Sequence, residues 1–210
     1  MLIIAEKMNP IISIIIINYN TLDLTSRCIS SIYENNTVNN IEIIIVDNAS
    51  NREPIDPLIV KHPEIKLIKS DRNLGFAGGN NLGISYAKGK YILLLNSDTE
   101  IRNDAIQIAY NIIQSQRNIG VITGQLLNPD GTIQPQAGRF PSLKHELKEL
   151  LRLNKLLSPH KRSQEYLGTE CNYNTPIYAD WVWGAFFMFK KDDLNHFPEK
   201  KLHDNFFMYG

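Results

Sequence analysis

An unbroken apolar run, residues 91–95 (YILLL), is followed directly by the polar residues 96–99 (NSDT). Because no polar residue interrupts the run, it is typical of a strand buried on both faces in the middle of a parallel sheet. In open α/β sheets the ligand crevice lies outside the carboxyl ends of the strands, so Asp98 is expected at a ligand site. The same residues also suit a turn in which Asp98 or Thr99 caps a helix through about residue 115. This stretch alone leaves both interpretations open.

The first hundred residues repeat this pattern of buried strand and helix. The predicted strands are residues 11–17, 41–46, 65–69 and 91–95, and the predicted helices between them are residues 21–34, 55–61 and about 82–88. Thr21 or Asp23 is expected to cap the first helix, and Gly89 to close the third. Such alternation predicts a mostly parallel central sheet with helices on both faces, an α/β fold. Polar residues end three of the strands, so a shared site is expected at that edge.

Three features point to a nucleotide-diphosphate ligand. Residues 71–81 (DRNLGFAGGNN) are expected to form a loop, in which Gly75, Gly78 and Gly79 let the backbone approach a ligand and the following helix offers free N–H groups to an anion. This segment matches neither of the common glycine-rich phosphate motifs, so it is a weak indication by itself. Asp47, at the end of the second strand, can accept from a base N–H. Asp98 supplies a hard oxygen ligand for Mg²⁺ or Mn²⁺ bridging phosphates.

The pattern changes after residue 115. A strand at 120–127 and a turn at 128–131 (NPDG) predict a small hairpin with residues 132–134, followed by a helix at 141–157. The polar residues 158–175 are expected to be a loop. The aromatic-rich segment 179–190 is expected to lead into a last buried strand, and residues 192–197 form a short helix. Residues 139–166 hold seven Lys or Arg and three Glu. This excess favours a solvated helix face, with an anionic lipid or acceptor as the alternative.

Composition narrows the functional classes. The 210 residues carry 22 basic and 22 acidic side chains, and this balance argues against nucleic acid as the main partner. Two cysteines, Cys28 and Cys171, show neither paired spacing nor a metal-ligand pattern, which favours a reducing, cytoplasmic setting. The longest apolar run near the N-terminus is far too short to span a bilayer, and no signal peptide is recognisable.

Six segments, in this order and spacing, resemble glycosyltransferase family 2, and within it the bacterial rhamnosyltransferase-like enzymes of polysaccharide assembly. They are SIIIINYN (13–20), IVDNAS (45–50), NLGFAGGNNLG (73–83), LLLNSDTE (93–100), LLNPDGTIQP (126–135) and ADWVWGAFFMFK (179–190). The resemblance implies a GT-A fold (the nucleotide-diphospho-sugar transferase fold) in one domain, with a nucleotide-binding half at 11–100 and an acceptor-side half at 101–210. It also implies inverting transfer of a sugar from dTDP-rhamnose or a UDP-sugar to a polysaccharide or lipid-linked glycan of the cell envelope.

The resemblance also assigns site residues. The nucleotide pocket would contain Asn18, Asn20, Asp47, Asn73, Gly75 and Asn96. NSD matches the DXD-type motif of the family, with Asn96 in its first position and Asp98 in the metal-binding position, so the implied cofactor is Mg²⁺ or Mn²⁺. The sugar and acceptor pocket would include Asp180, Trp181 and Gly184. There Asp180 would bond a sugar hydroxyl and Trp181 or Trp183 would stack on a sugar face. Core packing is the alternative for both tryptophans.

One departure concerns the general base. In this family an acidic pair follows a segment like FFMYG, and its carboxylate takes the proton of the acceptor hydroxyl. This chain stops at Gly210, and Asp204 matches an upstream residue with a structural role. The expectation is therefore a truncated domain that is inactive as it stands. Contact with the inner face of the cell membrane is an open possibility.

Two other functions remain open. One is a non-catalytic module that binds sugar nucleotides, which the missing base favours. The other is a sugar nucleotidyltransferase, which shares the sheet architecture. Such an enzyme would need a glycine-rich, basic loop after the first strand, and residues 18–23 (NYNTLD) contain no Gly, Lys or Arg.

Overall fold

The computed structural model describes residues 9–140, 142–158, 161 and 177–205. The chain forms two compact units, residues 1–122 with 184–210, and residues 123–183. Most of the polar loop predicted for residues 158–175 lies outside the described residues. Within the described residues no helix combines the length and the apolar character that crossing a bilayer requires.

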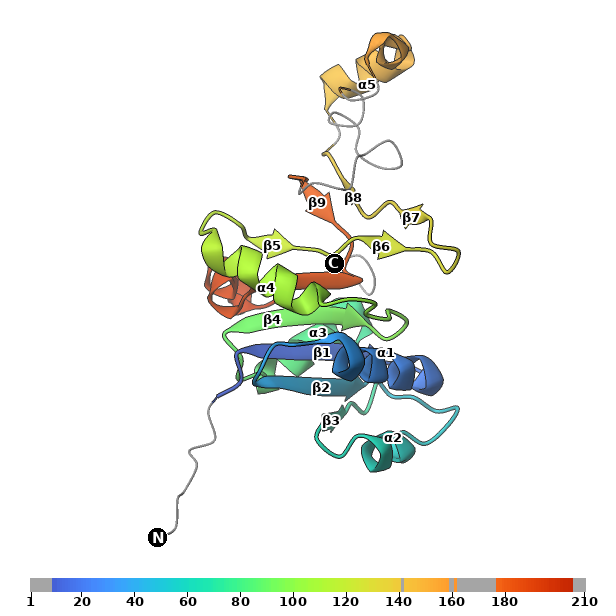
Figure 1. The fold of residues 1–210 in the computed structure, drawn as a ribbon, viewed down its shortest axis with the longest axis vertical. Coiled ribbons are helices and arrows are strands. Elements are labelled where there is room, and N and C mark those ends of the chain that lie inside the picture. Colours follow the sequence, from blue (N-terminus) through green and yellow to red (C-terminus); the bar gives the residue numbers. More distant parts are fainter. Residues whose placement is uncertain (1–8, 141, 159–160, 162–176, 206–210) are drawn as a thin grey trace. The chain divides into compact units, whose positions relative to one another are not determined.

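The first unit is built on a six-stranded sheet with the strand order β3-β2-β1-β4-β10-β5 (Figure 1). Its strands are β1 (Ile12–Asn18), β2 (Ile41–Asp47), β3 (Lys66–Lys69), β4 (Tyr91–Asn96), β5 (Val121–Ile122) and β10 (Phe186–Lys190). The first four strands run parallel, as predicted, whereas β10 is antiparallel to both β4 and β5. The sheet is therefore mostly parallel.

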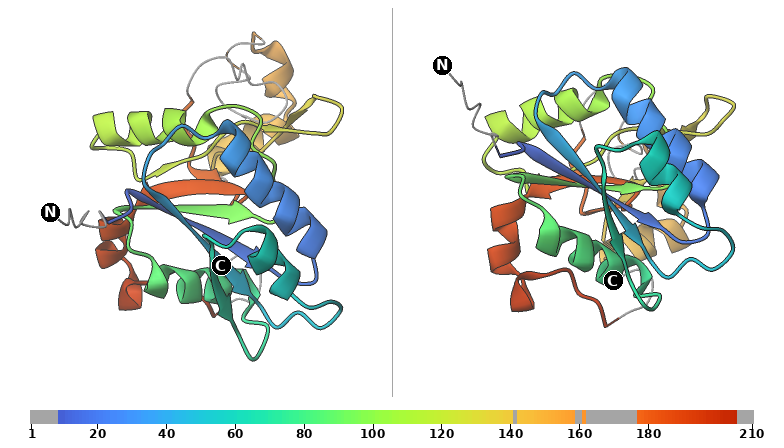
Figure 2. Two further views of the ribbon diagram at one scale, coloured as in Figure 1. Left: turned by 60° about the horizontal axis from the view of Figure 1, so that its bottom comes forward. Right: turned by 90° about the horizontal axis from the view of Figure 1, so that it is seen from below.

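Helices cover both faces of this sheet (Figure 2). They are α1 (Leu22–Asn35), α2 (Asp56–Lys61), α3 (Gly75–Tyr86), α4 (Ala105–Ser115) and the 3₁₀ helix η3 (Lys191–His196). A second 3₁₀ helix, η4 (Pro198–Lys200), follows η3 and buries no residue. Side chains of α1, α2 and α4 pack on one face, and those of α3 and η3 on the other. Because alternate strand residues point to opposite faces, both faces of the central strands must be apolar.

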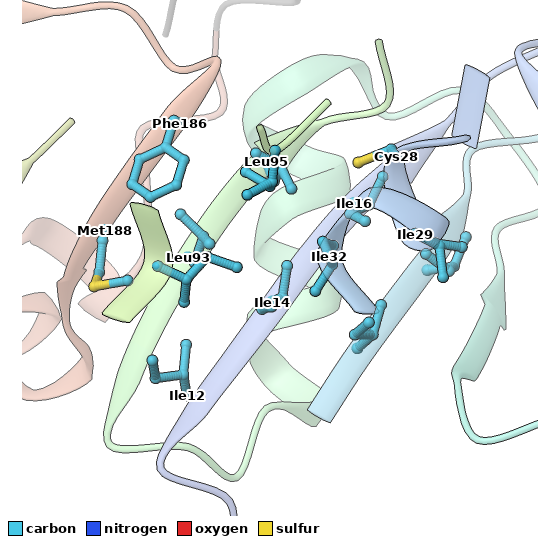
Figure 3. Close-up of a cluster of buried hydrophobic side chains, with 14 of the residues drawn as sticks. Ile12, Ile14, Ile16, Cys28, Ile29, Ile32, Leu93, Leu95, Phe186 and Met188 are labelled. Carbon is cyan, nitrogen blue, oxygen red and sulfur yellow. The ribbon is translucent and has the colours of Figure 1, made fainter. Parts of the chain in front are cut away.

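The core explains why these strands lack polar alternation. Ile12, Ile14 and Ile16 point to the face that α1 covers, where Figure 3 shows them with Cys28, Ile29 and Ile32 of that helix. Ile15 points to the opposite face, in the cluster that includes Ile84 of α3. All of these side chains are buried. Apolar burial on both sides of the sheet supplies the main stabilisation of this unit.

The register brings the polar strand ends to one edge. Asn18 is paired with Asp47 across β1 and β2, and Ile17 is paired with Asn96 across β1 and β4. The chain continues from β1 toward β2 and β3 on one side, and then crosses to β4 on the other. The strand order thus reverses at β1, which is where open α/β sheets place their ligand crevice. The predicted meeting of the polar ends is confirmed.

The glycine-rich segment is helical, which corrects the expectation of a loop through residue 81. The third helix, α3, begins at Gly75, whose φ of 70° is readily adopted only by glycine. Gly79 and Gly83 lie inside α3 and let it approach the sheet closely. A Cβ on Gly79 would lie 3.0 Å from Cδ1 of Ile17, and one on Gly83 would lie 2.5 Å from Cγ2 of Ile15.

The predicted N-cap position of Thr21 is confirmed, and two other predicted helix ends need correction. Thr21 precedes α1 without a side-chain cap bond, and its hydroxyl donates to Oδ1 of Asn18. Asp98 and Thr99 do not cap α4, which begins only at Ala105. Gly89 does not close α3, which ends at Tyr86; it is instead packed against β1, where a Cβ would lie 2.5 Å from the Ser13 nitrogen.

The second unit contains two short strand pairs and the predicted helix. The pairs are β6 (Leu126–Leu127) with β7 (Ile133–Gln134), and β8 (Ala137–Gly138) with β9 (Trp181–Val182). The β6–β7 pair confirms the predicted hairpin, in which Gly131 has a φ of 83°. The predicted strand 120–127 is divided into β5 and β6. The buried side chain of Gln136 donates to the Gly124 carbonyl, which lies between the two strands. It also accepts from the N–H of Leu126, the first residue of β6.

The predicted helix 141–157 is divided as well. It forms α5 (Leu143–Leu150) and the 3₁₀ helix η1 (Leu153–Leu156). Arg152 lies between them with a φ of 55°, a left-handed conformation that an α-helix cannot contain.

Candidate functional site

A pocket of about 310 Å³ lies at the carboxyl edge of the sheet in the first unit. It is lined by Ile17, Tyr19, Thr21, Leu24, Asn48, Asn73, Gly75, Phe76, Asn80, Leu95, Asn96, Ser97 and Asp98. These residues come from the ends of β1, β2 and β4 and from the first turns of α1 and α3. The volume is in the range of small-molecule sites. The pocket therefore occupies the crevice that the sheet topology predicts.

Asn18 fixes the loop that follows β1. Its side chain is buried and donates to Oδ1 of Asp47 and to Oγ of Ser50, both at 3.0 Å. Its Oδ1 accepts from the hydroxyls of Thr21 and Thr25, at 3.2 and 2.8 Å. The amide thus ties the end of β2 to the start of α1. Neither Asn18 nor Asp47 belongs to the pocket lining.

Asn20 holds the same loop from the outside. It adopts a φ of 58°, a left-handed conformation that Asn tolerates better than most residues. Its Oδ1 accepts from the N–H groups of Asn51 and Arg52, and its own N–H donates to Oγ of Ser50. This arrangement leaves Tyr19, the residue before it, on the pocket wall.

A second amide network shapes the wall beside α3. Asn48 is buried, and its Nδ2 donates to Oδ1 of Asn73 at 2.8 Å and to the Gly75 carbonyl at 3.2 Å. Its Oδ1 accepts from the Leu74 N–H at 2.9 Å, and Oδ1 of Asn73 also accepts from the Gly75 N–H. Asn48 therefore holds the turn that starts α3. The first N–H groups of that helix have no carbonyl partner within the helix.

The turn after β4 forms the opposite wall. The Asn96 N–H donates to the Ala185 carbonyl, and the Asn96 carbonyl accepts from the Thr99 N–H at 3.1 Å. Oγ of Ser97 lies 3.2 Å from Oγ1 of Thr21, which joins this turn to the β1 loop. Asp98 is exposed on the pocket. Of the two interpretations of Asp98, a residue at the ligand crevice or a helix cap, its position on the pocket wall fits the first.

Cys28 lies beneath the same turn and is fully buried. Its thiol donates to the Asn96 carbonyl at 3.6 Å. Burial, with smaller contributions from the negative charges of Asp98 and Glu100, raises the pKa of this thiol to about 12. Cys28 is therefore a neutral packing residue and not a nucleophile.

Two residues of α3 that sequence reasoning missed, Phe76 and Asn80, complete the pocket. Nδ2 of Asn80 donates to the Phe76 carbonyl one turn earlier. The ring of Phe76 contacts Gly184, where an added Cβ would lie 2.7 Å from Cζ. Gly184 therefore does not line the pocket itself but packs against Phe76, which does. A helical interpretation of residues 75–81 would have found both lining residues, because positions 76 and 80 share one helix face.

Asp180 and Trp181 belong to the second unit. The Asp180 carboxylate pairs with Arg139 at 3.3 Å and accepts from the Phe140 N–H at 3.0 Å. The Trp181 indole donates to the Arg139 carbonyl and lies on Gly138, where a Cβ would be only 2.3 Å from the ring. Trp181 and Trp183 are 41% and 50% exposed, so neither is a core residue.

The predicted site residues therefore fall into three sets. Asn73, Gly75, Asn96 and Asp98 line the pocket. Asn18, Asn20 and Asp47 lie behind it and hold its loops. Asp180 and Trp181 form a cluster of their own in the second unit, with Gly184 in the first. Besides Phe76 and Asn80, the prediction missed Tyr19, Asn48 and Ser97, which lie in the polar strand ends that it did recognise.

The charge of the pocket fits a divalent cation shared with an anionic ligand. Its lining contains one carboxylate, Asp98, and neither Lys nor Arg. Within the part of the chain that is described, no group of three His, Cys, Asp or Glu could enclose an ion. Mg²⁺ is commonly held by one or two carboxylates together with phosphate oxygens and water, so Asp98 suits that kind of site.

A mostly parallel sheet with a pocket at its topological switch point, beside a helix N-terminus, is the architecture of an open α/β fold, in which the ligand crevice lies at the carboxyl ends of the strands. The chain belongs to glycosyl transferase family 2, whose sequence model matches residues 13–196. The fold is GT-A. A solved structure with this fold is that of the mannosyltransferase PcManGT from Pyrobaculum calidifontis, in complex with GDP-Man and Mn²⁺. The superposition covers 94% of this chain and 49% of the PcManGT chain, with a TM-score of 0.60 and 16% sequence identity.

Sequence relatives have glycan-related names. The glycosyltransferase GlyG of Streptococcus pneumoniae is 31% identical over 126 residues, 59% of this chain and 41% of GlyG. The low-salt glycan biosynthesis hexosyltransferase Agl10 of Haloferax volcanii is 32% identical over 164 residues, 69% of this chain and 50% of Agl10. The chain thus matches half or less of the length of each of these relatives.

Proposed function

We propose that this chain binds a nucleotide-diphosphate sugar and forms the donor side of an inverting glycosyltransferase of the hexosyltransferase type. The observation that carries the proposal is the pocket at the switch point, with Asp98 on one wall and the start of α3 on the other. Family membership and the names of Agl10 and PcManGT support the class of donor.

The residues around the pocket suggest how a donor would be held. The diphosphate would lie near the N–H groups that begin α3, where a helix terminus favours an anion. A divalent cation at Asp98 would neutralise the diphosphate and stabilise it as a leaving group. The lining contains no Lys or Arg that could do this, and the loop after β1 contains no basic residue either. Both facts count against the nucleotidyltransferase alternative.

The remaining predicted residues keep supporting or sugar-side roles in the proposal. Asn18, Asn20 and Asp47 would hold the loops behind the pocket, so that the predicted contact of Asp47 with the base gives way to a supporting role. Asp180 and Trp181 would contact the sugar or the glycan acceptor, since an exposed indole presents a flat apolar face to a sugar ring. The acceptor would be a polysaccharide or a lipid-linked glycan. Its hydroxyl would attack the anomeric carbon as the diphosphate departs, and a carboxylate base would take the proton.

Calorimetric titration of this chain with dTDP, UDP and GDP, with and without Mn²⁺ or Mg²⁺, tests the donor site. We expect one nucleotide to bind more tightly when the metal is present, and Asp98→Ala to abolish that metal-dependent gain. A preference for dTDP would favour the rhamnosyl donor, and a preference for UDP or GDP would exclude it.

The matched control is Asp192→Ala. Asp192 is an exposed carboxylate on η3, which follows β10 at the edge of the sheet where β4 begins. This variant should bind as the unmodified chain does. If the folded chain binds none of the three nucleotides under any of these conditions, the proposed donor site is wrong.

A further inference from the structure

Exposed leucines gather on α5 and directly after it in the second unit. Leu143, Leu147 and Leu150 recur at spacings of four and three residues, which places them on one face of the helix, and Leu151 follows its last residue. None of them is buried, and Leu143 and Leu150 are 90% and 78% exposed. A core-facing amphipathic helix would bury such a face. Here the face is solvent-exposed among the residues that the structure describes.

The 3₁₀ helix that follows extends this surface. Leu153 and Leu156 of η1 are also exposed, Leu156 to 82%. Six exposed leucines thus occur within fourteen residues. The leucine surface, as defined by these six side chains, is much denser in apolar groups than the scattered exposed residues of an ordinary surface.

Basic residues accompany the leucines. Residues 139–161 contain six Lys or Arg and two Glu, so the rest of this net-neutral chain carries a net charge of −4. This segment therefore carries a net charge of +4 along the sequence, although Arg139 is itself paired with Asp180. Arg152 and Lys155 lie between and beside the leucines and are exposed.

These observations favour one kind of partner. A coiled-coil partner would need apolar positions sustained over several heptads, whereas α5 has only eight residues. Exposed leucines on a short helix with a basic surround are the composition of helices that lie in the interface of an anionic bilayer. The exposed leucines thus favour the lipid alternative for this basic stretch over the solvated helix face that its sequence suggests.

We propose that α5 and η1 form a peripheral membrane-docking surface. The leucines insert among the lipid headgroups, and the surrounding Lys and Arg side chains contact anionic phosphates. This surface is separate from the donor pocket, whose lining contains no residue of the second unit. Membrane docking and donor binding can therefore be tested independently on the same chain.

The test is co-sedimentation of the chain with vesicles of 30% phosphatidylglycerol and 70% phosphatidylcholine, beside pure phosphatidylcholine vesicles. We expect the chain to sediment with the anionic vesicles and to bind the neutral ones at least about tenfold more weakly. The triple variant L143Q/L147Q/L150Q should lose at least about tenfold in binding to the anionic vesicles, because it removes most of the inserted apolar area. The double variant R152Q/K155Q should weaken binding and reduce its dependence on salt.

The matched control is V60Q/I108Q, which replaces exposed apolar residues of α2 and α4 and should bind vesicles as the unmodified chain does. Circular dichroism and nucleotide titration verify that each variant is folded. Failure of the unmodified chain to bind anionic vesicles, or equal binding by the leucine triple variant, would overturn the proposal. So would a dimer in sedimentation equilibrium that the triple variant abolishes, because the leucines would then serve a second copy of the chain.

Discussion

At the residue scale, side-chain amides hold the edge of the sheet together. Asn18 and Asn48 are buried, and each satisfies its donors and acceptor with groups from different loops. A short amide is suited to this position because it offers two donors and an acceptor without a charge to desolvate. The pocket walls therefore depend on residues that a ligand need not contact.

The substitution Asn48→Ala tests this role. It would remove the acceptor of the Leu74 N–H and the donor to Asn73 and Gly75, leaving partly buried groups without partners. We expect a loss of about 1–3 kcal/mol in the free energy of unfolding and weaker nucleotide binding, since the start of α3 would shift. Urea unfolding and calorimetry measure the two effects. The control Asn51→Ala, at an exposed loop position, should stay within about 0.5 kcal/mol. Equal stability of both variants would show that the network is dispensable.

At the element scale, α3 is the helix that connects the core to the site. Its first turn lines the pocket, while its glycines let the helix backbone pack directly on β1 and β2. Helix propensity disfavours glycine in such a position. Close packing of α3 on the sheet therefore decides the composition of this helix and, with it, the place of Phe76 and Asn80.

The substitution Gly83→Ala compares two opposing effects, the loss of close packing against the sheet and the gain in helix propensity. The new Cβ would lie 2.5 Å from Cγ2 of Ile15 and 3.2 Å from Cγ2 of Val46, both in the filled core. Overpacking costs about 1–3 kcal/mol, whereas the helix propensity of alanine offsets about 1 kcal/mol. We expect a net loss of about 1 kcal/mol in unfolding free energy, measured by denaturant titration. Gly120→Ala, where nothing lies within 4 Å, serves as the control and should be near neutral. A stabilised Gly83→Ala chain would contradict the close-packing explanation.

At the scale of the whole molecule, the two units divide the proposed work. The first unit contains both core clusters and every residue of the pocket lining. The second contains Asp180, Trp181 and the leucine surface. Nucleotide recognition therefore belongs to the first unit in our proposal, and recognition of the sugar, acceptor and membrane to the second.

Replacing residues 124–182 by a six-residue Gly-Ser linker tests this division. Because Ile122 pairs with Met188, the linker must span roughly 14 Å, which six residues can reach. We expect the shortened chain to unfold in one cooperative transition and to bind its nucleotide diphosphate within about threefold of the full chain, since its pocket is complete. It should lose any preference for the nucleotide sugar over the nucleotide alone. Calorimetry compares the two ligands. Loss of cooperative unfolding would show that the first unit depends on the second.

Local sequence determined the order of the elements and the edge at which the site lies. The apolar runs of β1, β2 and β4 can be satisfied only by burial on both faces, and their polar ends must then meet, so Asn96 and Asp98 were expected at this edge without coordinates. Asn73 and Gly75 were assigned to the pocket by the family resemblance. The hairpin at β6 and β7 was equally local, because its turn residues fix the backbone.

Tertiary structure determined the features that depend on residues distant in sequence, namely where some helices and strands begin and which polar residues line the pocket. The glycines of α3 suggest a loop until Ile15 and Ile17 are seen to occupy the space beside them. Residues 120–127 are divided between two sheets because β5 pairs with the distant β10 while β6 pairs with β7. Burial also separated Asn18, which holds a loop, from Asn73, which lines the pocket, although both are polar residues after a strand. The free energy of these contacts comes from long-range packing and hydrogen bonding, and local sequence patterns do not encode it.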